Sequence, residues 1–108
     1  GAGLYLEVIA PDPAAPVPPH PRSFGLDHAG APRLANWIVR RADLDGLPAW
    51  AGAPVALSRG ALSWTIAVPP DGTLPMAGGY PTAIAWGADV PHPATRLPDR
   101  GVRLLRLE

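Results

Sequence analysis

The sequence predicts a small α+β domain that contains more strand than helix. With 108 residues, the chain has room for a single domain with one modest core. Hydrophobic residues make up 47% of it and charged residues 17%, which provides enough apolar surface to offset the entropy cost of ordering the chain. The 12 glycines and 16 prolines fall mainly between short apolar runs, where they favour turns that separate strands.

The first predicted strand covers residues 4–10, an apolar run that is interrupted only by Glu7. With the period of two that strands have, Glu7 shares a face with Tyr5 and Ile9. A carboxylate among apolar neighbours needs a partner, so we expect Glu7 to be buried and paired with an arginine or with backbone donors.

Residues 11–33 contain seven prolines and no sustained periodicity, which predicts a Pro-rich crossing loop. A second strand is predicted over residues 34–41. Asp43 follows as the N-cap of a helix. Gly46 and Pro48 limit that helix to about one to three turns, because glycine weakens a helix and proline removes a hydrogen-bond donor from it.

The carboxy-terminal half predicts four further strands. Residues 55–58 and 62–68 flank Arg59-Gly60, which indicates a tight hairpin, and the second of these runs alternates apolar with small or polar side chains. Residues 82–86 and 102–107 are the other two predicted strands. Strands, a long loop, one short helix and more strands together define the α+β class.

Composition excludes several classes of function. Nine arginines balance nine acidic residues, so no net charge attracts phosphate backbones or anionic lipid. The chain has no cysteine, which excludes disulfides, thiolate nucleophiles and zinc sites built on thiolates. No apolar run approaches the roughly 20 residues of a membrane span. We therefore expect a cytoplasmic protein that binds neither nucleic acid nor membranes.

Several stretches carry a resemblance to a known family. They are residues 3–10 with Asp12-Pro13, residues 24–27, Trp37 to Leu44, Ser58-Arg59 with residues 62–64, residues 81–87, and His92-Pro93. In this order they resemble the glyoxalase-like domain of the vicinal oxygen chelate superfamily, whose members pair two βαβββ modules. The resemblance implies a cupped mixed β-sheet with one short helix and an extra strand at each end.

Two departures from the family pattern affect what the resemblance implies. Members of the family begin with a strand that carries an Asp-His pair, and no segment of this chain is similar to that beginning. We therefore expect residues 1–108 to form a single, partial glyoxalase-like domain. The helix after Asp43 and the hairpin at Arg59-Gly60 are also shorter than is usual in the family.

Metal-dependent members of the superfamily place ligands on the first and last strands of each module. The resemblance puts Glu7 at one such position and Trp37 and Trp86 at two others. Indole cannot ligate a metal, because its nitrogen only donates a hydrogen bond. One carboxylate is too few for a divalent ion, so we expect no metal cofactor from this chain alone and keep Glu7 as the candidate ligand. The three histidines are interpreted as loop residues: His20, His28 and His92.

The predicted ligand pocket consists of Glu7, Arg59 and three tryptophans that are candidates for its apolar wall: Trp37, Trp64 and Trp86. The alternative is that the tryptophans fill the core, which is favoured for Trp64 because it shares an apolar face with Leu62 and Ile66. Arg59, beside the hairpin, is a candidate for holding an anionic ligand, and the alternative is a solvated turn residue. The sequence identifies no catalytic residue, since it has neither a phosphate-binding loop nor a nucleophile elbow.

The expected function is to bind a small organic molecule in a cupped β-sheet. Two alternatives remain open: a metal-dependent lyase or dioxygenase whose ligands a partner chain completes, and a structural or protein-interaction module. Half of a paired-module sheet leaves unpaired backbone edges and an open apolar face, so we also predict a homodimer.

Overall fold

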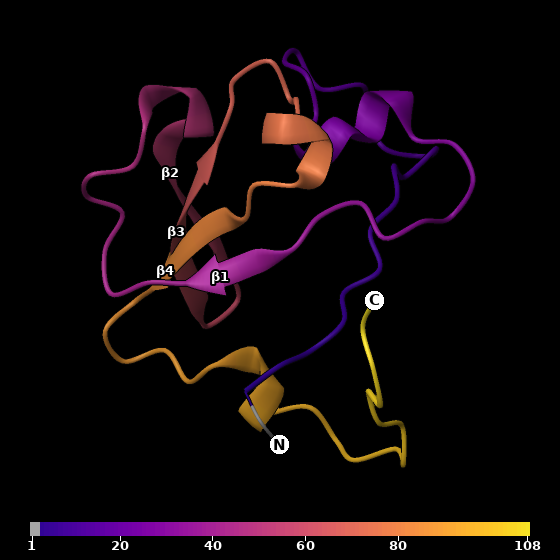
Figure 1. Cartoon of the computed structure of the whole chain (residues 1–108), viewed down its shortest axis with the longest axis vertical. Coiled ribbons are helices and arrows are strands. Elements are labelled where there is room, and N and C mark those ends of the chain that lie inside the picture. The colour runs from indigo at the N-terminus through magenta and orange to yellow at the C-terminus, as the bar shows by residue number, and fades with distance from the viewer. Residues whose placement is uncertain (1–2) are drawn as a thin grey trace.

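The computed structural model describes residues 3–108 and centres on a four-stranded mixed β-sheet (Figure 1). The strands are β1 (Ile38–Arg40), β2 (Ala53–Arg59), β3 (Leu62–Val68) and β4 (Thr82–Trp86). Their order in the sheet is β1-β4-β3-β2, with β1 and β4 parallel and the other neighbours antiparallel. The sheet stays open at both edges. This architecture confirms the predicted α+β class and the predicted succession of one strand, a helical turn and three strands.

Helical structure in the described part of the chain is limited to short 3-10 segments. They are η1 (Ser23–His28), η2 (Ala49–Ala51), η3 (Pro75–Gly78) and η4 (Pro93–Thr95). Within residues 3–108, no helix has the length and the hydrophobicity that crossing a membrane would require.

The hairpin predicted at Arg59-Gly60 is confirmed. Strands β2 and β3 pair from Arg59 opposite Leu62 to Ala53 opposite Val68, which leaves a loop of two residues. All seven residues of β2 are exposed, and its outer edge pairs with no other strand among residues 3–108. An unpaired edge of this kind is able to pair with a strand of another chain. The homodimer expected from the sequence stays a prediction.

The two faces of the sheet differ in side-chain size. Alternation along each strand, combined with the register between strands, assigns every residue to a face. The covered face carries small or short side chains: Val39, Ala83, Ala85, Thr65 and Ala67. Apart from Thr82, the open face carries mostly larger ones: Ile38, Arg40, Ile84, Trp86, Trp64, Ile66, Val55, Leu57 and Arg59.

The core cluster lies on the covered face and does not need a helix. Leu44 packs against Ala67 and Ala83, although the helix predicted after Asp43 is not formed there. The Asp43 carboxylate accepts a hydrogen bond from the Asp45 backbone N–H at 3.0 Å, which makes a tight turn. Pro48 then precedes the single 3-10 turn η2, because a proline inside a longer helix would have broken its hydrogen bonding.

The predicted strands at the two ends of the chain are wrong. Residues 4–10 and 102–107 adopt no regular structure, and their apolar side chains are exposed, with Leu6 at 79% and Leu105 at 94%. An apolar run becomes a strand only when a neighbour satisfies its backbone groups, and neither segment pairs with the sheet. Glu7 is accordingly exposed, where we expected a buried, paired carboxylate. The predicted strand at 34–41 shortens to β1 for the same reason, since only three of its residues pair with β4.

The Pro-rich crossing loop, residues 11–33, packs against the loop that follows β3. The Gly25 backbone N–H donates to the Gly72 carbonyl at 2.7 Å, and η1 and η3 lie near each other in Figure 1. A Cβ on Gly72 would lie 2.3 Å from the Arg22 carbonyl oxygen, so only glycine allows these two loops to approach this closely.

Candidate ligand-binding site

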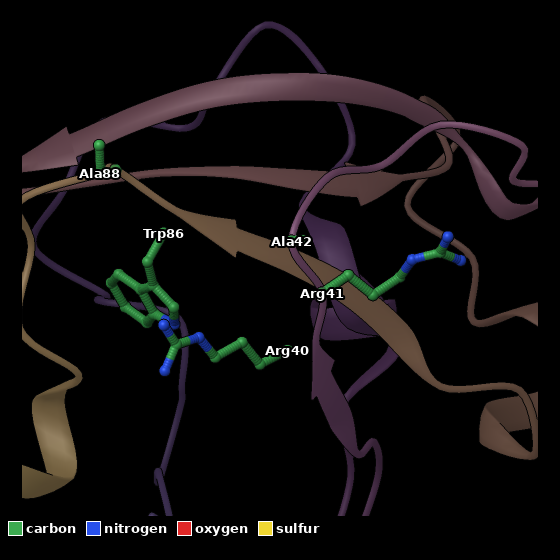
Figure 2. Close-up of a pocket in the computed structure, with 6 residues that line it drawn as sticks. Arg40, Arg41, Ala42, Trp86 and Ala88 are labelled. Carbon is green, nitrogen blue, oxygen red and sulfur yellow. The ribbon is translucent and has the colours of Figure 1, made fainter.

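An open pocket of about 350 Å³ lies where the parallel strands β1 and β4 end (Figure 2). Three residues from each strand end line it: Arg40, Arg41, Ala42, Trp86, Gly87 and Ala88. Ligands of open sheets often bind at the carboxyl ends of parallel strands, where the loops diverge and leave space. The volume is at the lower end of the range of roughly 300–1,000 Å³ that small-molecule sites occupy.

The two arginines of this pocket differ in orientation. Figure 2 shows the Arg40 guanidinium directed toward the Trp86 indole, whereas the Arg41 side chain points away from it. Arg41 donates a hydrogen bond to the Asp45 carbonyl oxygen at 3.2 Å. Arg40 forms no ion pair among residues 3–108, and no acidic side chain lines the pocket. The wall of the pocket is therefore cationic, with one arginine free to meet a ligand.

Trp86 is part of a row of aromatic rings. Its ring centroid lies 5.6 Å from that of Trp64 and 6.1 Å from that of His92, and His92 lies 5.6 Å from Tyr5. The His92 contacts are edge-to-face, which the quadrupoles of the rings favour, and the Trp pair is tilted by 51°. We call these four residues the aromatic row. It links the amino-terminal segment to the open face of the sheet.

His92 and Tyr5, the two members of the aromatic row that lead from Trp86 to the amino-terminal segment, are held by a local hydrogen bond and by burial. His92 Nδ1 accepts from the Ala94 backbone N–H at 3.3 Å, which orients the imidazole at the start of η4. Burial raises the pKa of the Tyr5 hydroxyl, and the negative charge of Glu7 raises this pKa further. Tyr5 is consequently neutral at physiological pH and packs as an aromatic ring.

Gly87 fixes the geometry at the end of β4. Its backbone N–H donates to the Ser63 carbonyl oxygen at 2.9 Å, so the chain after β4 stays close to β3. A Cβ on Gly87 would lie 2.5 Å from Ser63 Oγ. A side chain at this position would therefore require the Ser63 hydroxyl to rotate and the Val90 side chain to shift.

The structure places three of the five predicted pocket residues on one face of the sheet, and one of them, Trp86, lines the pocket. Trp64, Trp86 and Arg59 share the open face, and the two tryptophans are in contact. Trp37 lies before β1, where its carbonyl oxygen accepts from the Thr82 backbone N–H at 3.0 Å. Alternation assigns it to the covered side, at the opposite end of β4 from Trp86. Glu7 lies in the exposed amino-terminal segment and does not line the pocket.

Sequence reasoning missed Arg40, Tyr5 and His92 as neighbours of Trp86. Arg40 ends a predicted strand, and the alternation of that strand was visible in the sequence. Its place beside Trp86 depends on the register between β1 and β4, which pairs Arg40 with Ile84. No local pattern encodes a register between strands more than forty residues apart.

A second pocket, of about 370 Å³, lies beside η2. It is lined by Ala49, Trp50, Gly52, Pro69, Pro70, Asp71 and Thr73. Asp71 accepts hydrogen bonds from the Thr73 backbone N–H at 3.0 Å and from its hydroxyl at 2.7 Å, and these two donors lower the Asp71 pKa. Because its carboxylate already has local donors and no cation lines the pocket, this site is less suited to a polar ligand than the one at Trp86.

The described side chains do not fit the divalent metal that the family resemblance implies for metal-dependent members. Across residues 3–108, no three His, Cys, Asp or Glu side chains gather in a group able to hold an ion. A divalent ion needs several converging donors to replace its hydration shell, and the exposed Glu7 supplies only one carboxylate.

The fold and the site define a small α+β domain with an open mixed sheet and a cationic, aromatic pocket at its strand ends. The family model described as "Glyoxalase-like domain" matches residues 1–108. The chain therefore belongs to the glyoxalase-like domain family, which confirms the resemblance seen in the sequence. Comparison with curated proteins gives no match, and neither does comparison with solved structures.

Proposed function

We propose that this glyoxalase-like domain binds a small organic acid in the pocket at the ends of β1 and β4. The observation that carries the proposal is the Arg40 guanidinium, directed toward the Trp86 indole in a pocket without acidic side chains. Guanidinium matches the geometry of a carboxylate, with two parallel N–H donors. An indole beside it packs against the apolar body of the same molecule.

The lining residues supply binding rather than chemistry. Arginine stays protonated at physiological pH, and the indole nitrogen only donates, so neither Arg40 nor Trp86 is able to accept a proton from a substrate. The other four lining residues contribute backbone, methyl groups and the Arg41 side chain that reaches the Asp45 carbonyl. The pocket by itself holds and orients a ligand.

The proposal is tested by titrating the protein with biphenyl-4-carboxylate and following tryptophan fluorescence and the indole N–H resonances. We expect saturable binding that perturbs the resonance of Trp86. Biphenyl-4-carboxamide has the same shape without the charge, and we expect it to bind roughly fivefold more weakly, the size of one exposed ion pair.

Paired variants locate the site. Arg40→Gln is expected to remove the preference for the carboxylate over the carboxamide, and Trp86→Phe to weaken both ligands. Trp37→Phe and Trp50→Phe are the matched controls, since neither residue lines this pocket. Binding that is unchanged in both site variants, or lost in Trp37→Phe, would contradict the proposal.

A further inference from the structure

Two arginines without ion pairs lie on the open face, at opposite ends of the tryptophan pair. Arg40 is on β1 and Arg59 is at the end of β2. Both are exposed, and the ion pairs within residues 3–108 involve other arginines. Two free guanidinium groups on one face provide two separate positions for acidic groups.

The register places these residues along one diagonal of the sheet. Arg40 pairs with Ile84, two residues before Trp86 on the same face, and Trp86 pairs with Trp64. Trp64 in turn pairs with Leu57, two residues before Arg59. With strands about 4.8 Å apart and about 3.4 Å of rise per residue, the Cα atoms of Arg40 and Arg59 are roughly 20 Å apart.

The middle of this diagonal is apolar. The Trp64 and Trp86 centroids are 5.6 Å apart, and Leu57 beside them keeps 46% of its side chain exposed. An exposed leucine next to two half-buried indoles offers contact area to a flat hydrophobic body. The diagonal thus has cationic ends and an aromatic centre.

We infer that the open face binds an elongated aromatic dianion. One carboxylate meets Arg40, the linked rings lie across Trp86 and Trp64, and the second carboxylate meets Arg59. A molecule of two linked rings with a carboxylate at each end is shorter than this Cα–Cα span, and the long, flexible arginine side chains cover the difference. This inference rests on the proposed function, which itself requires only Arg40 and Trp86.

The test compares biphenyl-4,4'-dicarboxylate with biphenyl-4-carboxylate by calorimetry and by the indole resonances. The two probes share the same body and differ by one acidic group. We expect the dicarboxylate to bind roughly fivefold more tightly at low ionic strength and to perturb the resonances of both Trp64 and Trp86. Arg59→Gln is expected to remove this difference while leaving the affinity for the monocarboxylate unchanged.

Arg100→Gln is the matched control, because Arg100 belongs to the carboxy-terminal segment, which lies away from the sheet in Figure 1. Equal affinities for the two probes, or an advantage of the dicarboxylate that survives in Arg59→Gln, would overturn the inference while the proposed function stands. Absence of binding by both probes would overturn the two together.

Discussion

The two faces of the sheet differ in side-chain size, but burial differs between strands: the central residues of β3 and β4 are buried on both faces, whereas β2 is exposed along its whole length. The covered face has small side chains such as Ala67 and Ala83, at 2% and 3% exposure, with Leu44 packed on them. The open face has the larger apolar residues, yet Leu57 stays 46% exposed. Small residues let Leu44 pack closely on the covered face, and the edge position of β2 leaves its apolar side chains on the open face as surface for a ligand or a second chain.

This comparison separates the stabilising part of the sheet from the part available for binding. On the open face, Ile66 and Ile84 are buried at its centre, and exposure increases toward Leu57 and Val55 on β2. The pocket at Trp86 lies at the ends of β1 and β4, on the side of the sheet away from β2. Variants at buried positions and variants along the exposed β2 should therefore differ in their effect on folding.

The largest expected effect is a difference in the free energy of unfolding between two leucine-to-alanine variants, one buried against the covered face and one exposed on the open face. Leu44→Ala should lower the free energy of unfolding by about 2–4 kcal/mol, because it removes the side chain that covers Ala67 and Ala83. Leu57→Ala should lower it by less than about 1 kcal/mol, because much of that side chain is already in water. Urea denaturation of both variants at low protein concentration provides the measurement. Equal losses would show that the open face is covered in solution.

A smaller effect is expected at the polar contact that anchors the open face. Thr82 is 7% exposed, and Asn36 Nδ2 donates to its hydroxyl oxygen at 2.9 Å. Thr82→Val should cost about 1–2 kcal/mol, since the half-buried amide loses its partner. Thr65→Val on the covered face is the control, and a loss there of the same size would assign the effect to the strand rather than to the hydrogen bond.

The smallest effect on stability is expected for the ion pair across η1, between Arg22 and Asp27, which lies on neither face of the sheet. The Arg22 backbone N–H donates to Asp27 at 2.8 Å and its guanidinium at 2.6 Å, and these bonds lower the Asp27 pKa. A carboxylate with a lowered folded-state pKa stabilises the fold above its unfolded pKa of about 3.9 and loses that contribution as pH falls through the folded value. Asp27→Asn should therefore lose less stability than the parent protein between pH 5 and pH 2, as followed by thermal unfolding. Identical acid profiles would contradict this.

The sequence by itself determined the elements that depend on neighbouring residues. The hairpin at Arg59-Gly60 and the strand at residues 82–86 follow from alternation and turn chemistry, and both appear at the predicted places. The family also followed from the order of short stretches along the chain. The helix after Asp43 was overestimated, because Leu44 contacts the core equally well from a turn.

Only the tertiary structure decided which segments pair and which residues meet. Residues 4–10 have the pattern of a strand but remain unpaired, because a strand is completed by its neighbour rather than by its own sequence. Trp37 and Trp86 occupy similar positions in the family pattern, yet the register of β1 against β4 separates them and brings Arg40 to Trp86 instead. Alternation specifies two faces for each strand, and only pairing between distant strands decides which faces coincide.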